Sequence, residues 1–298
     1  MNNLLSYYYD ITTNNIRKHN NNYFFVFKKN KYCLNALEEV NFNYFLNMMQ
    51  NLKYNVYVHT LVLNKEKKYI TFDGTKYYVL FKINITSDRI ININDIILFN
   101  KYIFLYDYPN INKKMCIEKW SKKIDYFEFY FDSRDDVSNE LKNIFYYIVG
   151  LGEVAIKYLS INNSINTGDT IICHKRIKYK YTLYDLYNPL NFIYDEKTRD
   201  VAEYIKSLFW NEKWSYNNIQ VIISTVNYNE NNFIFLISRL LFPTYFFDLF
   251  DEYFNNELED IYIIKKFDKI KEYQTYIRNI IAIINTMKRL HMPSIDWL

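Results

Sequence analysis

The chain has 298 residues, which is enough for two lobes that each bury a core. Its net charge is +4 with the charges interleaved, and no nucleic-acid-binding motif accompanies the short basic runs, so we expect no nucleic-acid partner. The three cysteines are far apart and odd in number, which argues against a disulfide framework or a zinc site and favours a reducing compartment.

The composition points to an AT-rich, low-GC genome. The chain holds 32 Tyr and 23 Phe but only four Gly and four Pro, and it is dense in Asn, Ile and Lys. These over-used residues share AT-rich codons, so the aromatic excess indicates codon bias rather than base stacking or sugar binding. Turns that most proteins build from Gly or Pro are expected to use Asn and Asp, which tolerate left-handed backbone.

Neither the N-terminal residues nor the most apolar segment predicts export or membrane insertion. Residues 1–7 lack a basic segment followed by a long apolar core, so we expect no signal peptide. The most apolar window, Phe233–Phe250, contains Arg239, Pro243 and Asp248. These residues favour a buried helix pair over a membrane span. We therefore expect synthesis in the cytoplasm.

The first part of the chain predicts strands and one helix. Two short apolar runs flank Lys28-Lys29-Asn30, as in a hairpin. Apolar residues then recur with helical spacing, and strands return with the turn signal Asp73-Gly74 between the last two. The expected elements are strands Tyr23–Phe27 and Lys31–Leu34, helix Leu37–Leu52, and strands Tyr54–Val62, Lys68–Phe72 and Lys76–Ile85.

The second part predicts helices from about Ile111 onward. Cys116–Phe131 is aromatic and amphipathic, and a further helix is expected to start at the acidic pair Asp135-Asp136. Two glycines, Gly150 and Gly152, are expected to interrupt that helix before it resumes. After Asp200 the pattern is helical almost to the end.

A loop with unusual chemistry lies between these helices. The order and spacing of His174-Lys175-Arg176 and Tyr181 resemble the catalytic loop of small-molecule kinases, which carries His-Gly-Asp and an Asn five residues after the Asp. Arg176 stands at the position of the catalytic Asp, and a guanidinium cannot accept the proton of an attacking hydroxyl. Tyr181 stands at the Asn position, where magnesium prefers a carbonyl or carboxylate oxygen. The loop is therefore expected to be degenerate, with no catalytic residue.

The former metal position is ambiguous in register. Either Asn191 or Asp195 aligns with the metal-binding Asp that follows such a loop. One carboxylate alone holds magnesium poorly, so we expect no metal site and no cofactor, with ATP and Mg²⁺ as the alternative. No glycine precedes Gly74, and the strand Tyr32–Asn35 contains no lysine that could reach phosphates.

Five segments carry a resemblance to a known family, in the same order along the chain: 150–159, 173–176, 192–205, 238–243 and 293–298. Together they resemble the YutH-type spore coat-associated proteins, which belong with the CotS-like group of the aminoglycoside phosphotransferase and protein kinase-like superfamily. The resemblance implies an α+β, two-lobed protein kinase-like (aminoglycoside phosphotransferase-like) fold with a β-rich N-lobe and a helical C-lobe. It also implies a role in the spore coat of a Firmicute, other spore coat proteins as partners, and synthesis in the mother cell before deposition on the spore.

The domain organisation follows from the element order. Residues 1–95 are expected to form the N-lobe, with mixed strands and one helix, and residues 96–298 the helical C-lobe with the degenerate loop.

Two residues are expected to have structural roles. Asp200 is predicted to cap helix Val201–Trp210, with Glu203 completing a capping box. Arg239 lies in an apolar helix and is predicted to form a buried ion pair, with Asp200 as a candidate partner.

For other residues the sequence leaves alternative roles open. His174 is expected to support the loop, and Arg176 either pairs with Asp195 or Asp185 or binds an anionic ligand. The terminal Trp297 and Leu298 either dock on the body or form a partner-binding tail.

Three functions are compatible with this sequence. The one we favour is a catalytically inactive pseudokinase that acts in coat structure or assembly. The others are a divergent small-molecule or protein kinase using Asp185 and Asp195, and a regulatory module that binds a nucleotide without hydrolysing it.

Overall fold

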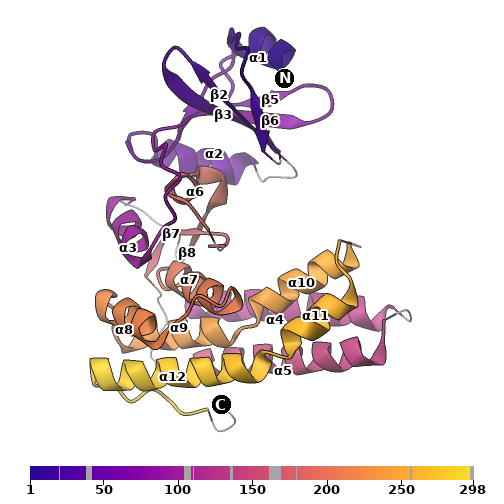
Figure 1. Ribbon diagram of the computed structural model, residues 1–298, viewed down its shortest axis with the longest axis vertical. Helices are drawn as coiled ribbons and strands as arrows, with labels where there is room; N and C mark the ends of the chain where they lie inside the picture. Colours follow the sequence, from indigo (N-terminus) through magenta and orange to yellow (C-terminus); the bar gives the residue numbers. More distant parts are fainter. Residues whose placement is uncertain are drawn as a thin grey trace. The chain divides into compact units, whose positions relative to one another are not determined.

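The computed structural model describes residues 1–19, 21–37, 42–103, 109, 111–134, 137–160, 169–178, 180–255 and 257–295. The chain folds into two compact units (Figure 1). The first comprises Met1–Asp107 with Lys180–Ile193, and the second comprises Tyr108–Tyr179 with Tyr194–Leu298. The segment 180–193 thus returns to the first unit, and the simple lobe boundary between residues 95 and 96 stays a prediction.

The first unit is built on an antiparallel sheet with the strand order β1-β2-β3-β6-β4, and β5 pairs with β6. The predicted hairpin is confirmed: β2 pairs with β3 through a turn in which Lys28 and Lys29 both adopt positive φ angles. The elements are α1 (Asn2–Tyr9), β1 (Arg17–His19), β2 (Asn22–Phe27), β3 (Asn30–Leu37), α2 (Phe42–Asn51), β4 (Thr60–Val62), β5 (Ile70–Phe72), β6 (Tyr77–Lys82), α3 (Ile93–Tyr102), α6 (Leu183–Leu186) and the short 3₁₀ helix Pro189–Asn191.

The core on one face of this sheet explains why these strands form. Alternating residues of β2, β3 and β6 point inward because side chains of a strand alternate between its two faces. Helix α1, which the sequence pattern did not predict, adds Leu5 to this core. The core cluster contains Leu5, Ile11, Phe25, Leu34, Tyr78 and Leu80.

Two expectations for the first unit need correction. Helix α2 begins at Phe42 rather than at Leu37, because Leu37 ends β3 and pairs with Tyr77 of β6; residues 38–41 lie outside the described part. The predicted strand Tyr54–Val62 shortens to β4, Thr60–Val62. The turn at Asp73-Gly74 is confirmed, and Gly74 adopts a φ of 96° there.

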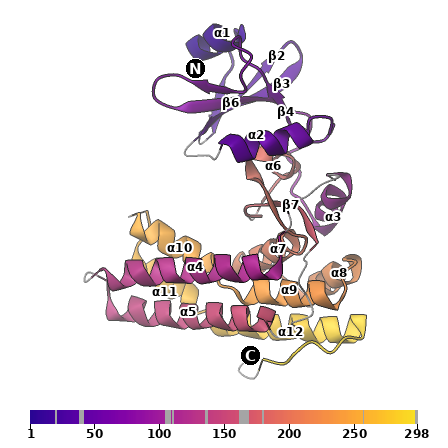
Figure 2. The same ribbon diagram turned by 180° about the vertical axis from the view of Figure 1, so that it is seen from behind.

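The second unit is mostly helical (Figure 2). Its helices α4, α5, α9 and α12 run alongside one another, and a two-stranded sheet of β7 and β8 precedes α7. The elements are α4 (Lys113–Asp132), α5 (Asn139–Ser160), β7 (Thr170–His174), β8 (Phe192–Glu196), α7 (Arg199–Trp210), α8 (Tyr216–Thr225), α9 (Glu230–Leu241), α10 (Thr244–Phe254), α11 (Asp260–Phe267) and α12 (Ile270–Lys288).

Helix α5 is continuous, so the predicted interruption at Gly150 and Gly152 is wrong. Gly152 instead permits close helix packing, because a Cβ atom added there would lie 2.9 Å from Cδ1 of Ile124 on α4. The predicted helix start at Asp135-Asp136 lies outside the described residues, as do Trp297 and Leu298.

The apolar stretch is confirmed as a pair of core helices. Among the described residues, Glu230–Phe254 is the one stretch long and apolar enough to cross a membrane, and 83% of its most apolar window is buried inside the protein. It consists of α9 and α10, separated at Phe242 and Pro243. Its burial is typical of the core of a folded unit.

Candidate functional site

The end of strand β7 is joined to the start of helix α7 by a buried brace. Asp200 accepts hydrogen bonds from the backbone nitrogen of His174 at 2.8 Å, and its second oxygen lies 2.7 Å from Nδ1 of His174. Both side chains are 0% exposed. His174 and Asp200 therefore hold the loop that follows β7 in a defined position on α7.

The capping role predicted for Asp200 is wrong. Helix α7 begins at Arg199, its N-cap residue is Thr198, and Asp200 lies in the first turn. Asp200 cannot act as the cap because both of its oxygens contact His174. Glu203 does not complete a capping box either, and lies 3.8 Å from the ammonium of Lys206.

The carboxylate of Asp195, at the end of strand β8, is enclosed by positive charge. Arg199 donates to Oδ2 at 2.7 Å, Arg239 donates to Oδ1, and the backbone nitrogen of Glu196 also donates to Oδ1. Burial alone would raise the pKa of Asp195, but the guanidiniums of Arg239 and Arg199 hold it below its ordinary value. Asp195 is therefore ionised and has both oxygens occupied.

Arg239 forms the buried ion pair expected of it, but with a different partner. Its carboxylate partner is Asp195 rather than Asp200, and the two side chains are 7% and 10% exposed. The carboxylate of Asp200 contacts His174 instead, so Asp195 near the end of β8 is the residue that neutralises Arg239. Nε of Arg239 makes no hydrogen bond to any residue in the described part of the chain and lies 4.0 Å from the Glu196 carboxylate.

Glu196 is a second buried carboxyl that sequence reasoning missed. It is 0% exposed and accepts hydrogen bonds from the backbone and hydroxyl of Thr198. Burial raises the pKa of Glu196 to about 7, and nearby Arg239 only partly offsets this. The available signal was its position directly after Asp195, at the end of the strand β8.

Arg176 points to a third carboxylate. Its Nε and a terminal nitrogen donate to the two oxygens of Asp248 on α10, at 2.7 and 2.8 Å. The predicted pairing with Asp195 or Asp185 is therefore replaced by a bidentate pair with Asp248. The two side chains are 28% and 39% exposed, so this pair lies near the surface of the second unit.

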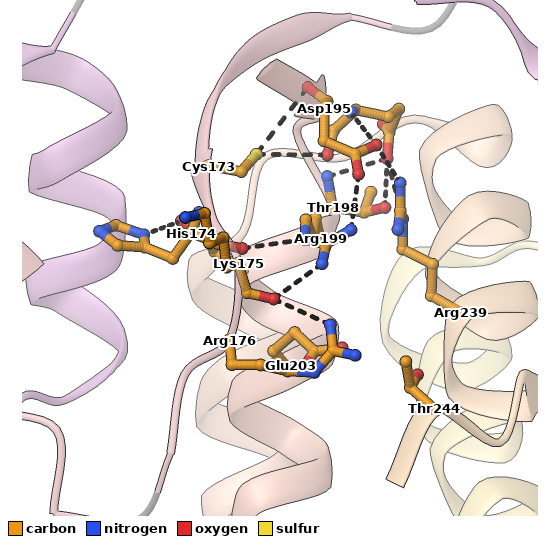
Figure 3. Close-up of polar contacts among 12 residues, drawn as sticks. Cys173, His174, Lys175, Arg176, Asp195, Thr198, Arg199, Glu203, Arg239 and Thr244 are labelled. Atoms are coloured by element: carbon orange, nitrogen blue, oxygen red, sulfur yellow. Dashed lines mark hydrogen bonds and ion pairs between the residues drawn. The ribbon is translucent and has the colours of Figure 1, made fainter. Parts of the chain in front are cut away.

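Arg199 links the loop to the Asp195 cluster (Figure 3). It donates to the backbone oxygens of His174 at 2.9 Å and Lys175 at 2.8 Å while it pairs with Asp195. One side chain thus fixes the backbone at the two positions that precede Arg176. The second unit brings together His174, Arg176, Asp195, Asp200 and Arg239.

The remaining predicted positions belong to the first unit. Tyr181 is buried, and its backbone oxygen accepts from Ile91. Asn191 ends the short 3₁₀ helix and its amide donates to the backbone of Asp185 at 3.4 Å. The carboxylate of Asp185 accepts from the backbone and hydroxyl of Thr182 and so completes the capping box of α6, whose N-cap residue is Thr182.

These contacts define the chemistry that the residues can perform. Arg176 carries no lone pair for a hydroxyl proton, and its donors are directed at Asp248 and at the Lys175 backbone. A magnesium ion at Asp195 would have to displace two guanidiniums from a carboxylate that is 10% exposed. Among the residues that the structure describes, no group of three or more His, Cys, Asp or Glu side chains gathers as for a metal ion. The donor set therefore does not fit magnesium.

The fold is that of the kinase-like phosphotransferases. An aminoglycoside phosphotransferase from Alicyclobacillus acidocaldarius is similar with a TM-score of 0.55, at 13% identity and with 93% of each chain covered. An AMP-bound spectinomycin phosphotransferase is similar with a TM-score of 0.57, at 12% identity, covering 96% of this chain and 98% of that one. At these identities the likeness shows the fold alone: two-lobed and α+β, with an antiparallel sheet in its N-terminal part and a mostly helical C-terminal part.

The chain belongs to the family described as "Spore coat putative kinase YutH", whose model matches residues 2–282. It is also 25% identical over 202 residues to the endospore coat-associated protein YutH of Bacillus subtilis (strain 168). That match covers 60% of this chain and 60% of the length of the relative. The family and the fold that the sequence motifs implied are both confirmed.

Proposed function

We propose that this chain is a spore coat component whose kinase-like fold has lost phosphoryl transfer. It is made in the cytoplasm of the mother cell, is then deposited on the spore, and acts in coat structure or assembly through contacts with other coat proteins. Membership of the spore coat family supports the location, and the chemistry of the site supports the loss of activity.

The observation that carries the proposal is the double neutralisation of Asp195. This carboxylate stands near the end of the strand that follows the degenerate loop, where an active enzyme needs a free oxygen for its metal ion. Arg199 and Arg239 occupy both oxygens instead, and Arg176 replaces the base of the loop. Loss of a general base alone costs about 10²–10⁴-fold in rate.

Phosphoryl transfer is the direct test of this proposal. Purified protein is incubated with labelled ATP, Mg²⁺ or Mn²⁺, and a panel of amino-alcohol and protein substrates. We expect no transfer above a control without protein. A signal that survives in the exposed control Asp125→Asn but disappears in Asp195→Asn would establish the divergent kinase instead.

The cellular part is tested in the endospore-forming host. A fluorescent fusion should collect around the forespore. A deletion strain complemented with Asp195→Asn should deposit its coat as the wild type does when the variant is folded and present at the wild-type level. Diffuse fluorescence throughout sporulation would contradict the location. A coat defect in Asp195→Asn at normal protein levels would contradict a coat role that does not require phosphoryl transfer.

One observation favours nucleotide binding without transfer as a second candidate. The first unit contains a hollow of about 940 Å³ whose lining includes the aromatic residues Phe24 and Tyr184 and the basic residues Arg17, Lys18 and Lys31. Aromatic faces and cations are suited to a base and its phosphates. Calorimetric titration with ATP in EDTA tests this candidate, and binding lost in Arg17→Gln/Lys18→Gln would support it.

A further inference from the structure

The second unit contains a hollow of about 850 Å³ formed by the loop 175–178 and the helices α7 and α10. This volume is within the range of pockets that hold small molecules, about 300–1,000 Å³. Its lining includes five basic and three acidic side chains: Lys175, Arg176, Lys178, Arg199 and Lys206, with Glu203, Asp248 and Glu252. Positive charge therefore exceeds negative charge in the lining.

Two of the five cations are already neutralised inside the protein. Arg176 is paired with Asp248, and Arg199 is paired with Asp195. The ammonium groups of Lys175 and Lys178 form no ion pair among the residues that the structure describes. Both residues are exposed, and partial burial still lowers the pKa of Lys175. Their ammonium groups are therefore accessible to an anion that enters the hollow.

Lys206 is the most buried of the three remaining cations. It is 6% exposed and donates to two neutral acceptors, the backbone oxygen of Phe242 at 3.1 Å and Oγ1 of Thr244 at 2.7 Å. The nearest carboxylate oxygen, on Glu203, lies 3.8 Å away. Burial lowers the pKa of Lys206 to about 8. The positive charge of Lys206 is therefore incompletely compensated.

An apolar wall stands beside these cations. The rings of Trp210 and Tyr245 stack with their centroids 4.4 Å apart and an angle of 8° between the planes. Both residues line the hollow. The two rings therefore give the hollow an apolar side that suits an apolar ligand body.

We propose that this pocket binds a small organic anion. Its phosphate or carboxylate group is held by Lys175, Lys178 and Lys206, and its apolar body packs on Trp210 and Tyr245. Asp195 does not line this hollow, although its partner Arg199 does. The inference does not depend on whether phosphoryl transfer has been lost.

Binding is measured with four probes and full-length protein at low ionic strength: phenyl phosphate, benzoate, inorganic phosphate and neutral benzyl alcohol. Isothermal titration gives the affinity, and quenching of tryptophan fluorescence reports on the wall. We expect phenyl phosphate and benzoate to saturate, inorganic phosphate to bind at least about 5-fold more weakly than phenyl phosphate, and benzyl alcohol not to saturate. Raising the salt concentration to 0.5 M should weaken the binding of the anions, because salt screens the charges of exposed lysines.

The variant Lys175→Gln/Lys178→Gln removes two loop charges without disturbing the core. We expect its affinity for phenyl phosphate to fall at least about 10-fold, with an unchanged circular dichroism spectrum. The matched control Lys122→Gln/Lys271→Gln removes two exposed charges that do not line the hollow and should stay within about 2-fold of wild type. Equal losses in both variants, or saturation by benzyl alcohol as tight as by phenyl phosphate, would overturn the proposal.

Discussion

Two arginine–aspartate pairs in the second unit contain the same ions in different surroundings. Arg239 and Asp195 are 7% and 10% exposed, whereas Arg176 and Asp248 are 28% and 39% exposed. In a buried pair each ion has given up its hydration, so removing one partner leaves an uncompensated charge. In an exposed pair water replaces the lost partner. Burial, rather than the pairing itself, therefore decides how firmly each carboxylate is held.

This difference has a functional meaning. Our proposal places Asp195 at the former metal position, where an active phosphotransferase needs a free carboxylate, and its two guanidiniums make it part of the core. Asp248 lines the hollow beside α7 and is 39% exposed. We therefore expect the Asp195 cluster to behave as a structural element and the Arg176 region to respond to ligands.

The largest effect is expected from Arg239→Leu. The substitution leaves Asp195 with one guanidinium and Glu196 with no close cation, both in a buried environment. We expect a loss of about 3–5 kcal/mol in the free energy of unfolding, measured by denaturant titration. The exposed control Arg278→Leu should change it by less than about 0.5 kcal/mol. A similar small change for Arg239→Leu would show that the cluster is not structural.

The sequence pattern predicted an ion pair for Arg239 and left one open for Arg176, but it did not predict the partner of either. A charged residue within the apolar helix α9 was enough to predict a buried ion pair for Arg239. Its partner was not predictable, because Asp195 and Asp200 lie five residues apart across a strand-to-helix turn whose geometry decides which one faces Arg239. Asp248 is 72 residues from Arg176, so only the packing of α10 on the loop could reveal that pair.

The fold was predictable to a similar degree, and for a related reason. Short runs rich in aromatic and β-branched residues identify β2, β3 and β6, and amphipathic spacing identifies α4. The continuity of α5 was not predictable, because Gly152 signals an interruption locally but serves close packing on Ile124. Local pattern misses features that depend on a neighbouring helix.

A smaller loss is expected from Asp200→Asn. The amide keeps one acceptor but presents a donor to either the backbone nitrogen or Nδ1 of His174, both at 0% exposure. Losing a buried hydrogen bond to a charged group costs about 1.5–3 kcal/mol, so we expect about 2 kcal/mol in a urea titration. Asp125→Asn on α4 should be neutral. An unchanged midpoint for Asp200→Asn would show that the contact between His174 and Asp200 does not stabilise the protein.

Glu196→Gln should change the pH dependence of stability. The pKa of Glu196 is about 7 in the folded protein against 4.5 in its ordinary state, so the folded protein binds more protons between these values. Stability contributed by the protonated carboxyl is therefore lost as pH rises from about 4.5 to 7. Gln mimics the protonated form, and we expect it to stabilise the protein by about 1–3 kcal/mol at pH 8.

The same variant should have little effect at pH 5, where Glu196 is already protonated. Asp195 contributes in the opposite sense, because its lowered pKa gives stability that is lost only as pH falls through the acid range. Thermal unfolding of the wild type and of Glu196→Gln from pH 5 to 8 separates the contribution of Glu196 from that of Asp195. Parallel curves for wild type and Glu196→Gln would exclude Glu196 as the titrating group.

The smallest effect is expected at the exposed pair, in a double-mutant cycle of Arg176→Gln and Asp248→Asn. Lys123 lies 3.6 Å from Asp248 and remains as a counter-ion when Arg176 is removed. The side chains are also partly solvated, so the coupling energy should be about 0.5–1 kcal/mol and should fall further in 0.5 M salt. The corresponding cycle of Arg239→Leu and Asp195→Asn should give a larger coupling that salt does not reduce, because that pair is buried. Equal couplings with equal salt dependence would show that burial does not separate the two pairs.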